Sequence, residues 1–548
     1  MLGGVNLQLF TALIGGGAIL GETLGVYSKN KNKKNDKMAN GRLSFKEDLK
    51  DIEGGFLQLS KNLSLKERMA FEGTVTIAPT GGGKTTSFFI PNLLNPNLQG
   101  SLIVYDPKGE LYEKTSYFQK NICGRDIVVF APLEPSISCK YNLLEQCEDT
   151  TEVLQLASTL ITNGSLAIEL VTGKKCGGAE WDNMATPLFS AALLYCKAQG
   201  LPIGTIENAF RLIIEKNLEE LNILFSNSTE DCKTQWDIFK SVGDADRTIG
   251  SIKITLATAL KIFGDKKICK VLSGISTFNP AHLRKKLTCI YIISEERKSS
   301  YVSPVMASFF SQLFDKVLDS YNKNSIPVYF FLDEFTNLGM LNNMSVNCAT
   351  VRSRKVSLNI CLQSISQLEQ IYGKDNALSI LNNLKTKIAF SGLSDLKTLN
   401  YFSDLCGNTQ IRICNTSITK DSTTKSYSYT TKRLFNKEDI RCLEEDKMLI
   451  VMHNKQPILD KKNIYYTQEK YNSKIKEKPI GIKLSKAIKT LNKKNKAITD
   501  EEYIKMFKEN IRLKTEKRIR KQEEDLMLDK IKNIDNHSTE KLVEELWK

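Results

Sequence analysis

The sequence predicts an α/β fold in which helices cover a mostly parallel sheet, and three observations predict it. Short apolar runs of strand length recur along the chain and are separated by helical stretches, as in parallel strands joined by crossover helices. A glycine-rich turn follows the first of these runs and leads into a helical pattern. From about 143 to 286, helical periodicity interrupts the apolar runs, which favours an all-α domain inserted into the sheet.

The expected strands are short and apolar. The first immediately precedes the glycine-rich turn and includes Thr76, and the second, Ser101–Tyr105, ends in the turn DPKGE. Later strands are expected at Asp126–Phe130, Thr288–Ser294, Val328–Leu332, Ser357–Leu362, Lys387–Ser391, Met448–His453 and Pro457–Leu459. We expect the last pair to complete an edge of the sheet.

The domain organisation follows from these patterns. Helical periodicity in the inserted stretch is clearest at Thr151–Ile161, Asn183–Gln199 and Ile249–Phe263. We therefore expect a nucleotide-binding-type α/β domain over 38–142 and 287–465, an all-α domain over 143–286, and extensions at 1–37 and 466–548. Residues 38–72 mix helical and turn signals and are expected to be a short polar lead-in.

Length and composition indicate a globular chain of several domains. The chain has 548 residues, of which 41% are hydrophobic and 25% charged, and this excludes a disordered or fibrous protein. Its net charge of +15 suits a polyanion or an anionic membrane surface as a partner. A compositional bias towards Lys and Asn explains the charge equally well, so composition leaves both interpretations open.

Cysteine and histidine usage argues against disulfide and metal frameworks. The 13 Cys are scattered and form no C-x-x-C pair, which is typical of reduced thiols in a cytosolic protein. The three His are far apart in the sequence, so histidine-based metal chemistry is not expected.

The N-terminal segment 1–37 is a candidate membrane anchor. Residues 1–21 carry no charged side chain, and Val5–Gly21 is mostly apolar, although a spanning helix needs about 20 apolar residues. Five Lys between Lys29 and Lys37 follow, which would keep the rest of the chain in the cytoplasm. A plain N-terminal helix is the alternative.

The C-terminal extension is dense in charge. Residues 470–548 contain 22 Lys or Arg against 14 Asp or Glu, a surplus of eight positive charges. Glu501–Ile534 has helical spacing, so we expect a charged helical tail. A recruitment arm and a solvated tail without a specific partner both fit this pattern.

The glycine-rich turn has the pattern of a loop that binds nucleoside triphosphate. Backbone N–H groups must curl around the phosphates, a Lys must reach the outer phosphates, and a hydroxyl must bind Mg²⁺. The corresponding residues are Pro79, Thr80, Gly81, Gly82, Gly83, Lys84, Thr85 and Thr86. Ala78 departs from the glycine usual at the first position, and a glycine-rich surface turn is the alternative interpretation.

Two adjacent acids end the apolar strand Val328–Leu332. A carboxylate at such a strand end can hold Mg²⁺ through a water, and its neighbour can polarise the water that attacks the γ-phosphate. We assign Asp333 to Mg²⁺ and Glu334 to water activation.

A second polar strand end follows at Gln363. A Gln beside the nucleotide strand can sense the γ-phosphate, and an Arg from a neighbouring subunit can stabilise the transferring charge. Arg352 and Arg354, directly before this strand, are the candidates for such an arginine. Taken alone, these residues also fit surface cations and a polar strand cap.

Seven segments together resemble the coupling proteins of type IV secretion systems, the VirD4/TraG-type conjugation ATPases. They occur in the family's order over roughly Glu72–Leu459 and read APTGGGKTTSFFIPNLL, VYDPKGELYEKT, EWDNMATPLFSAALLY, YFFLDEFTNLG, SRKVSLNICLQSISQLEQIYG, SGLSDLKTLNYFSDLCGN and LFNKEDIRCLEEDKMLIVMHNKQPIL.

The resemblance implies a RecA-like P-loop ATPase related to the HerA/FtsK class, which uses ATP and Mg²⁺ and works as a membrane-associated homohexamer. It implies a relaxase bound to single-stranded DNA as substrate, and type IV secretion channel components and the cytoplasmic membrane surface as further partners.

The resemblance also assigns roles to individual residues. Lys84 and Thr85 match the phosphate-loop pair, Asp333 and Glu334 the second acidic motif, and Gln363 the sensor glutamine. Arg354 best matches the arginine that acts on a neighbour's nucleotide, and Arg352 is the fallback. The remaining matches are to the DPKGE turn and to an early signature of the α-domain, and they are Asp106, Lys108, Glu110, Trp181 and Asp182.

Two functional alternatives remain at this point. One is a double-stranded DNA pump of the chromosome-segregation type, which the DPKGE turn and the helical insertion disfavour. The other is a docking platform for which nucleotide is an assembly ligand with little turnover. The family commonly has two membrane spans, whereas this chain has at most one weak span.

Overall fold

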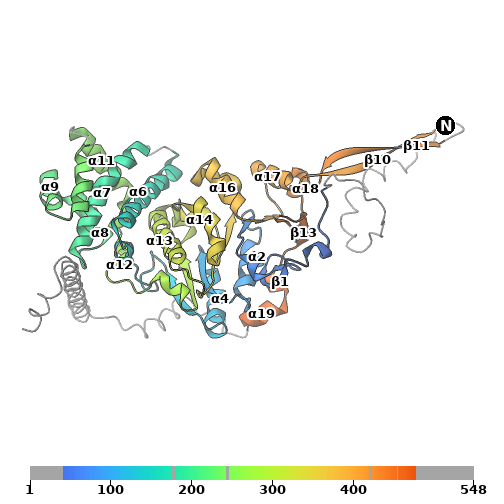
Figure 1. The fold of residues 1–548 in the computed structure, drawn as a ribbon, viewed down its shortest axis with the longest axis horizontal. Helices are drawn as coiled ribbons and strands as arrows, with labels where there is room; N and C mark the ends of the chain where they lie inside the picture. The colour runs from blue at the N-terminus through green and yellow to red at the C-terminus, as the bar shows by residue number, and fades with distance from the viewer. Residues whose placement is uncertain (1–40, 174–178, 242–245, 419–422, 453, 477–548) are drawn as a thin grey trace, which may run out of the picture.

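The computed structural model describes residues 41–173, 179–241, 246–418, 423–452 and 454–476 (Figure 1). Its centre is a nine-stranded sheet with the strand order β13-β12-β9-β3-β8-β7-β4-β6-β5. The strands are β3 (Thr74–Ile77), β4 (Ser101–Asp106), β5 (Asp126–Phe130), β6 (Thr288–Ile293), β7 (Val328–Leu332), β8 (Val356–Leu362), β9 (Thr386–Phe390), β12 (Lys447–Met452) and β13 (Ile458–Lys461).

The sheet is mostly parallel, as the sequence predicts. The seven strands from β9 to β5 in the sheet order pair in parallel, whereas β12 pairs antiparallel with both β9 and β13. Each expected strand is present within about two residues of its predicted bounds, and the last pair completes one edge. All residues of β4, β7 and β8 are buried, which explains their continuous apolar runs.

Two hydrophobic cores lie on opposite faces of the sheet. Along β4, Ile103 and Tyr105 belong to one core and Leu102 and Val104 to the other, as the two-residue period of a strand requires. The first core includes residues of α13 (Ser299–Asp319) and the second includes residues of α3 (Ile90–Leu93) and α4 (Glu110–Asn121).

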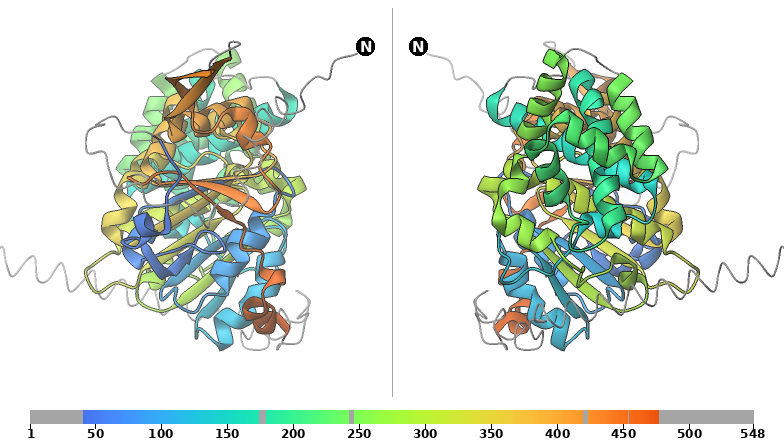
Figure 2. Two further views of the ribbon diagram at one scale, coloured as in Figure 1. Left: turned by 90° about the vertical axis from the view of Figure 1, so that its right-hand side faces the viewer. Right: turned by 90° about the vertical axis from the view of Figure 1, so that its left-hand side faces the viewer.

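Between β5 and β6 the chain forms helices. In the described part of 143–286 no strand is assigned, and helices account for the regular structure. Figure 1 shows most of them at one end of the molecule, and the right-hand view of Figure 2 shows them in front of the sheet. They are α5 (Leu143–Gln146), α6 (Thr150–Thr172), α7 (Ala179–Gln199), α8 (Ile206–Glu215), α9 (Leu218–Ser226), α10 (Glu230–Ser241), α11 (Asp246–Ala259) and α12 (Lys266–Leu272).

Helix α6 is the one described helix whose length and hydropathy would allow it to cross a membrane. Half of its most apolar window is buried inside the protein, and its buried residues belong to the first core. These contacts are those of a core helix. The proposed anchor at 1–37 lies outside the described residues.

The remaining α-helices precede, separate or follow the strands of the central sheet along the chain. They are α2 (Glu67–Ala70), α14 (Met344–Thr350), α15 (Ile365–Tyr372), α16 (Lys374–Asn383), α17 (Leu396–Cys406), α18 (Lys437–Arg441) and α19 (Glu469–Lys476). The charged tail beyond α19 lies outside the described residues.

Two small antiparallel sheets were not predicted. Strands β1 (Glu53–Gln58) and β2 (Ser64–Leu65) pair within the segment expected to be a helical and turn-rich lead-in, so that expectation is wrong for these residues. Strands β10 (Asn408–Ile418) and β11 (Thr423–Arg433) form a long hairpin. Figure 1 shows this hairpin projecting from the end of the molecule opposite to α9.

Candidate nucleotide site

Three neighbouring strands bring the predicted site residues to one edge of the sheet. Strand β8 lies between β3 and β7, and the pairing places Ile77 opposite Leu362 and Leu332 opposite Ile360. The glycine-rich loop, Gln363 and the pair Asp333-Glu334 follow these three strands directly, so all of them meet at the carboxyl ends of parallel strands. This is where open α/β sheets bind ligands.

The loop backbone adopts the curl that phosphate binding requires. Gly81 and Gly83 have φ of 75° and 86°, a region that strongly favours glycine. No atom lies within 4 Å of the position that a Cβ on Gly81 would take, so the loop is open to a ligand on that side. Lys84 ends the loop, and Thr85–Phe89 continue as a π-helical turn into α3.

Lys84 and Thr85 contact the two acids at the end of β7. The Lys84 ammonium forms an ion pair with Glu334, and its Nζ lies 4.0 Å from Asp333 Oδ1. The Thr85 hydroxyl donates a hydrogen bond of 2.8 Å to Asp333 Oδ2. The side chains of Lys84, Asp333 and Glu334 are less than 10% exposed, so these charges interact with little screening by water.

Gln363 extends the network from β8. Its Nε2 donates to Glu334 Oε2 at 3.1 Å, and its Oε1 accepts a hydrogen bond of 3.3 Å from Gln367 of α15. Glu334 therefore has Lys84 on one carboxylate oxygen and Gln363 on the other. This is a suitable position for a sensor glutamine.

Glu334 is held in an unfavourable backbone conformation. Its φ and ψ are 53° and 54°, in the left-handed region that costs a non-glycine residue about 1–3 kcal/mol. In this conformation the Glu334 carboxylate contacts Lys84 of the loop and Gln363 of the neighbouring strand end.

The acids are also placed so that a cation would stabilise them. Burial raises the pKa of Asp333 to about 6, although Lys84 opposes this shift. Asp106, at the end of the adjacent β4, has its pKa raised to about 7 by burial, and the Asp333 charge adds to the shift. Asp333 Oδ1 is buried without a hydrogen-bond partner.

These features fit Mg²⁺ and a nucleotide triphosphate. The unpaired carboxylate oxygen and the Thr85 hydroxyl are hard oxygen donors of the kind that Mg²⁺ binds, and the curled loop with Lys84 suits phosphates. Within the described residues, no group of three His, Cys, Asp or Glu forms an all-protein metal site. Two protein oxygen donors fit a Mg²⁺ ion that also takes substrate phosphates and waters as ligands.

The other predicted loop residues form hydrogen bonds within this curl or precede it. Pro79 and Thr80 precede the first positive-φ glycine, and the Gly82 backbone N–H donates to the Pro79 carbonyl. The Thr86 hydroxyl donates to the Gly83 carbonyl at 3.0 Å, which orients its side chain back along the loop.

The two candidate arginines lie at the amino ends of the parallel strands, opposite to the nucleotide loop. Arg352 and Arg354 belong to a 3-10 turn before β8, whereas the nucleotide loop lies beyond the opposite ends of the strands. Arg354 pairs with Asp319 at 3.6 Å and Arg352 with Glu72 at 3.2 Å. Neither arginine reaches the nucleotide loop of its own chain.

Lys462 is a site residue that the sequence did not reveal. From the segment after β13, its ammonium donates to the Gly82 carbonyl at 2.9 Å and to the Ser391 hydroxyl at 3.0 Å. The side chain is buried over the Phe390 ring, and burial lowers its pKa. No local motif marks it, because 380 residues separate it from Gly82 of the loop.

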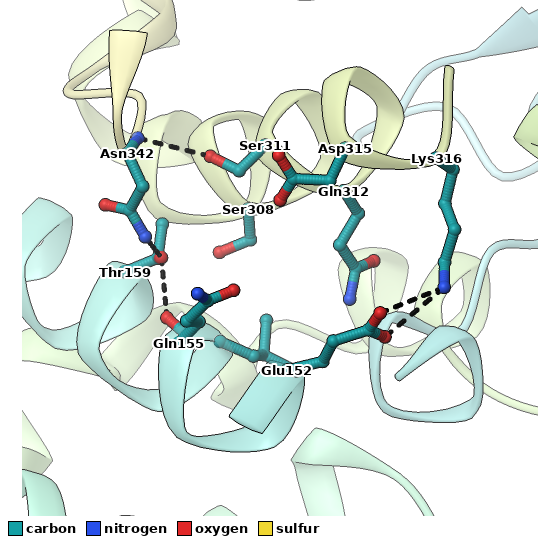
Figure 3. A pocket seen from close by; sticks show the side chains of 10 residues that line it. Glu152, Gln155, Thr159, Ser308, Ser311, Gln312, Asp315, Lys316 and Asn342 are labelled. Atoms are coloured by element: carbon teal, nitrogen blue, oxygen red, sulfur yellow. Dashed lines mark hydrogen bonds and ion pairs between the residues drawn. The ribbon is translucent and has the colours of Figure 1, made fainter. Parts of the chain in front are cut away.

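The segment after Glu334 joins the site to α6. The Asn163 side chain donates to the Met340 carbonyl at 3.0 Å and accepts from the Met340 N–H at 2.7 Å. Figure 3 shows the adjacent small cavity between α6 and α13, where Asn342 bonds Thr159 and Ser311. No loop residue lines this cavity, so it is separate from the nucleotide site.

A family model described as type IV secretory system conjugative DNA transfer matches residues 24–490. The chain belongs to this family. The match covers most of the chain and includes the nucleotide loop, both acids, Gln363 and Lys462. The resemblance drawn from the sequence motifs is thereby confirmed.

Individual relatives are more distant. The chain is 27% identical to Protein VirD4 of Agrobacterium fabrum over 420 residues, which cover 72% of the chain and 58% of that protein. It is 24% identical over 370 residues to the conjugal transfer protein TraG of Escherichia coli, covering 62% of the chain and 56% of that protein. The chain thus spans under two thirds of the length of these curated relatives.

Solved structures confirm the fold. The bacterial conjugative coupling protein TrwBdeltaN70 superposes with a TM-score of 0.62 at 13% identity, covering 78% of this chain and 92% of that one. TrwB in complex with the ATP analogue ADPNP gives a TM-score of 0.60 at 14% identity, covering 79% and 96%. The predicted RecA-like α/β architecture is therefore correct.

Proposed function

We propose that this chain is an ATP-driven coupling protein that moves single-stranded DNA, delivered with its relaxase, towards a type IV secretion channel. The observation that carries the proposal is the network of Lys84, Thr85, Asp333, Glu334 and Gln363 at one edge of the sheet. Family membership and the solved structures of TrwB in complex with ADPNP and with ADP and Mg²⁺ support it.

The geometry suggests how the chain's own groups act. Lys84 is paired with the Glu334 carboxylate. When a nucleotide binds, Lys84 can pair with the γ-phosphate in place of Glu334, and the Glu334 carboxylate then becomes free. Gln363 then keeps that carboxylate oriented, and Glu334 can accept the proton of an attacking water. Thr85 and Asp333 would hold Mg²⁺, which neutralises phosphate charge when bound.

Assembly is a further part of the proposal. Arg354 lies at the amino end of β8, away from the nucleotide loop of its own chain, so it can contact only the nucleotide of another subunit. This arrangement fits a homohexamer with nucleotide sites at the subunit boundaries. We also propose that the chain works at the cytoplasmic face of the membrane, with residues 1–37 as the anchor. DNA contacts of such a motor are mainly to phosphates and are therefore salt-sensitive.

Steady-state ATP hydrolysis by the purified full chain tests the proposal. We expect single-stranded DNA to stimulate hydrolysis more than duplex DNA of equal length does. Glu334→Gln should lower kcat by about 100-fold or more while ATP binding persists, because the proton acceptor is lost and the Lys84 and loop contacts remain. Hydrolysis that is absent under all DNA and salt conditions would favour a docking platform, and a duplex preference would favour a double-stranded DNA pump.

A further inference from the structure

The β10–β11 hairpin has two faces of different chemistry. Residues directly opposite each other in an antiparallel pair lie on the same face, and the register pairs Arg412 with Tyr429 and Cys414 with Tyr427. We call the face that contains these pairs the tyrosine face. Its described members are Asn408, Gln410, Arg412, Cys414, Thr416, Thr423, Lys425, Tyr427, Tyr429, Thr431 and Arg433.

The opposite face offers a different surface. It presents Ile411, Ile413 and Lys432 among Ser, Thr and Asn side chains, and it carries no aromatic ring. The two strands together contain four cations and no acid, and three of these cations lie on the tyrosine face.

The rings on the tyrosine face are accessible. Tyr427 is 51% exposed and Tyr429 is 69% exposed. The Arg412 guanidinium lies 3.5 Å from the centre of the Tyr427 ring, so a cation and an aromatic plane are already stacked on this face. Two open rings, two residues apart along one strand and flanked by cations, are a suitable surface for stacked bases and their phosphates.

We propose that the tyrosine face binds single-stranded nucleic acid, with Tyr427 and Tyr429 stacking on bases and Arg412 and Lys425 contacting phosphates. This inference rests on the proposed function, because it names a surface that would hold the DNA that the motor moves. Strands of 11 residues are about 36 Å long, enough to lie along several nucleotides.

The distribution of side chains favours nucleic acid over a lipid surface. A ribbon that enters a membrane interface needs apolar or aromatic residues towards its tip, whereas Thr416, Thr423 and Lys425, beyond the rings on this face, are polar. The rings lie in the middle of β11 on one face. That arrangement suits a polymer lying along the ribbon.

The anchoring of the hairpin is compatible with such a role. Arg433, at the base of β11, pairs with Asp404 at 2.7 Å, and the Asn408 carbonyl accepts a hydrogen bond from the Gly41 N–H. These contacts fix the base and leave Arg412, Lys425 and both rings exposed.

Fluorescence anisotropy with a labelled oligothymidine tests the proposal on the full chain. The double variant Tyr427→Ala/Tyr429→Ala should raise Kd by roughly tenfold or more, since each stacked base is expected to contribute measurably. Tyr427→Phe/Tyr429→Phe keeps both rings and should bind within about twofold of the parent. The matched control, Ile411→Ala/Ile413→Ala on the opposite face, should also leave Kd unchanged.

A second comparison uses two lysines of the same strand. Lys425→Ala removes a cation from the tyrosine face and should reduce the slope of log Kd against log salt by about one. Lys432→Ala removes the same charge from the opposite face and should leave that slope unchanged. Equal effects of the two variants would overturn the proposal, because charge alone would then explain binding.

The remaining outcomes separate this inference from the motor function. ATP hydrolysis without DNA should be the same in all hairpin variants, since none contacts the nucleotide loop. If hydrolysis is stimulated by DNA but the tyrosine variants bind DNA normally, the hairpin proposal fails and the motor stands. If the variants lose DNA binding but no ATP is hydrolysed, the hairpin proposal stands and the motor fails. Unchanged DNA binding with lost binding to anionic phosphatidylglycerol vesicles would assign the face to the membrane and overturn the proposal.

Discussion

Lys84 lies within 4.0 Å of the carboxylates of both Asp333 and Glu334, and these three groups determine the net charge at the centre of the site. Both acids are buried beside one cation, so the cluster of Lys84, Asp333 and Glu334 carries a net negative charge in a region with little water. Asp106 adds a third carboxyl group on the next strand. A site of this charge gains free energy from Mg²⁺ and loses it when a carboxylate must ionise without the metal.

The raised carboxyl pKa values predict a pH dependence of stability. Asp106 has a folded pKa of about 7, above its ordinary value, so the folded chain holds a proton that the unfolded chain releases. Its contribution to stability is therefore complete below about pH 4 and declines as the pH rises to about 7. Without Mg²⁺ and nucleotide, Asp106→Asn should raise the Tm at pH 8 by roughly 2 °C or more and flatten the pH profile.

Thermal unfolding between pH 5 and 8 checks this expectation. Asn retains an oxygen that can accept the Tyr112 N–H, so the backbone contact of Asp106 is preserved. Asp237→Asn, an exposed substitution on α10, serves as the control and should leave the profile unchanged. A Tm difference between Asp106→Asn and the parent that is the same at pH 5 and pH 8 would contradict the assignment.

Lys462 is predicted to set nucleotide affinity through the loop backbone. It bonds the Gly82 carbonyl and no other group of the loop, so Lys462→Met should loosen the curl without removing a catalytic group. We expect ATP affinity to fall by about tenfold with kcat nearly unchanged, since a hydrogen bond to a charged group contributes about 1.5–3 kcal/mol. Lys461→Met, at the adjacent exposed position, is the matched control.

Equilibrium binding of a fluorescent ATP analogue measures this effect directly. Equal losses of affinity in the two lysine variants would indicate a general electrostatic effect on an anionic ligand and not support of the loop.

Among the structural elements, the segment between β7 and α14 links the nucleotide site to the helical region. It begins at Glu334, passes through a 3-10 turn at Phe335–Leu338, and is held against α6 by Asn163 at Met340. Gly339 must be glycine, because its φ is 85° and a Cβ there would lie 2.4 Å from Asn163 Oδ1. A movement of Glu334 therefore has a short, bonded path to the first long helix of the α-rich region.

Removing the Asn163 amide should uncouple this path. Asn163→Ala leaves the partly buried Met340 backbone groups without their Asn163 partner, which should cost about 1–3 kcal/mol of stability. We expect ATP hydrolysis without DNA to persist while stimulation by single-stranded DNA falls at least several-fold. Asn227→Ala, at the exposed end of α9, should change stability by less than about 0.5 kcal/mol and leave stimulation intact. Full stimulation in Asn163→Ala would exclude this segment as the link.

The elements that the sequence predicted are those whose signal is local. Strands such as β7 and β8 are buried along their whole length, so their apolar runs identify them, and the loop and acids are contiguous motifs. The hairpin β10–β11 was missed because it packs on no core: its strands are mostly polar and contain no continuous apolar run, and the alternation around Arg412 and Tyr427 spans only a few residues. Lys462 and the Asn163 contact were missed because only the folded chain brings them to their partners.

For the whole molecule, the decisive feature is that the nucleotide loop and the candidate arginine Arg354 lie at opposite ends of the parallel strands of one sheet. One chain alone therefore cannot place Arg354 at its own Lys84, so the role proposed for this arginine requires a second copy. The net charge of +15 does not prevent such an assembly, because surface charges are screened beyond about 8–10 Å at physiological salt.

Mixed oligomers of two inactive variants test the arrangement. Arg354→Ala keeps its own nucleotide loop, and Lys84→Ala keeps its arginine, so each alone should lose at least about 100-fold in ATP hydrolysis. In an equal mixture, on the order of one quarter of the interfaces join an intact loop to an intact arginine, and activity should return to about that level. Arg352→Ala alone is expected to stay active, so mixing it with Lys84→Ala should not restore a lost activity. Recovery that appears with Arg352→Ala instead would transfer the role to Arg352, whereas unimpaired hydrolysis by both single arginine variants would remove either residue from the site.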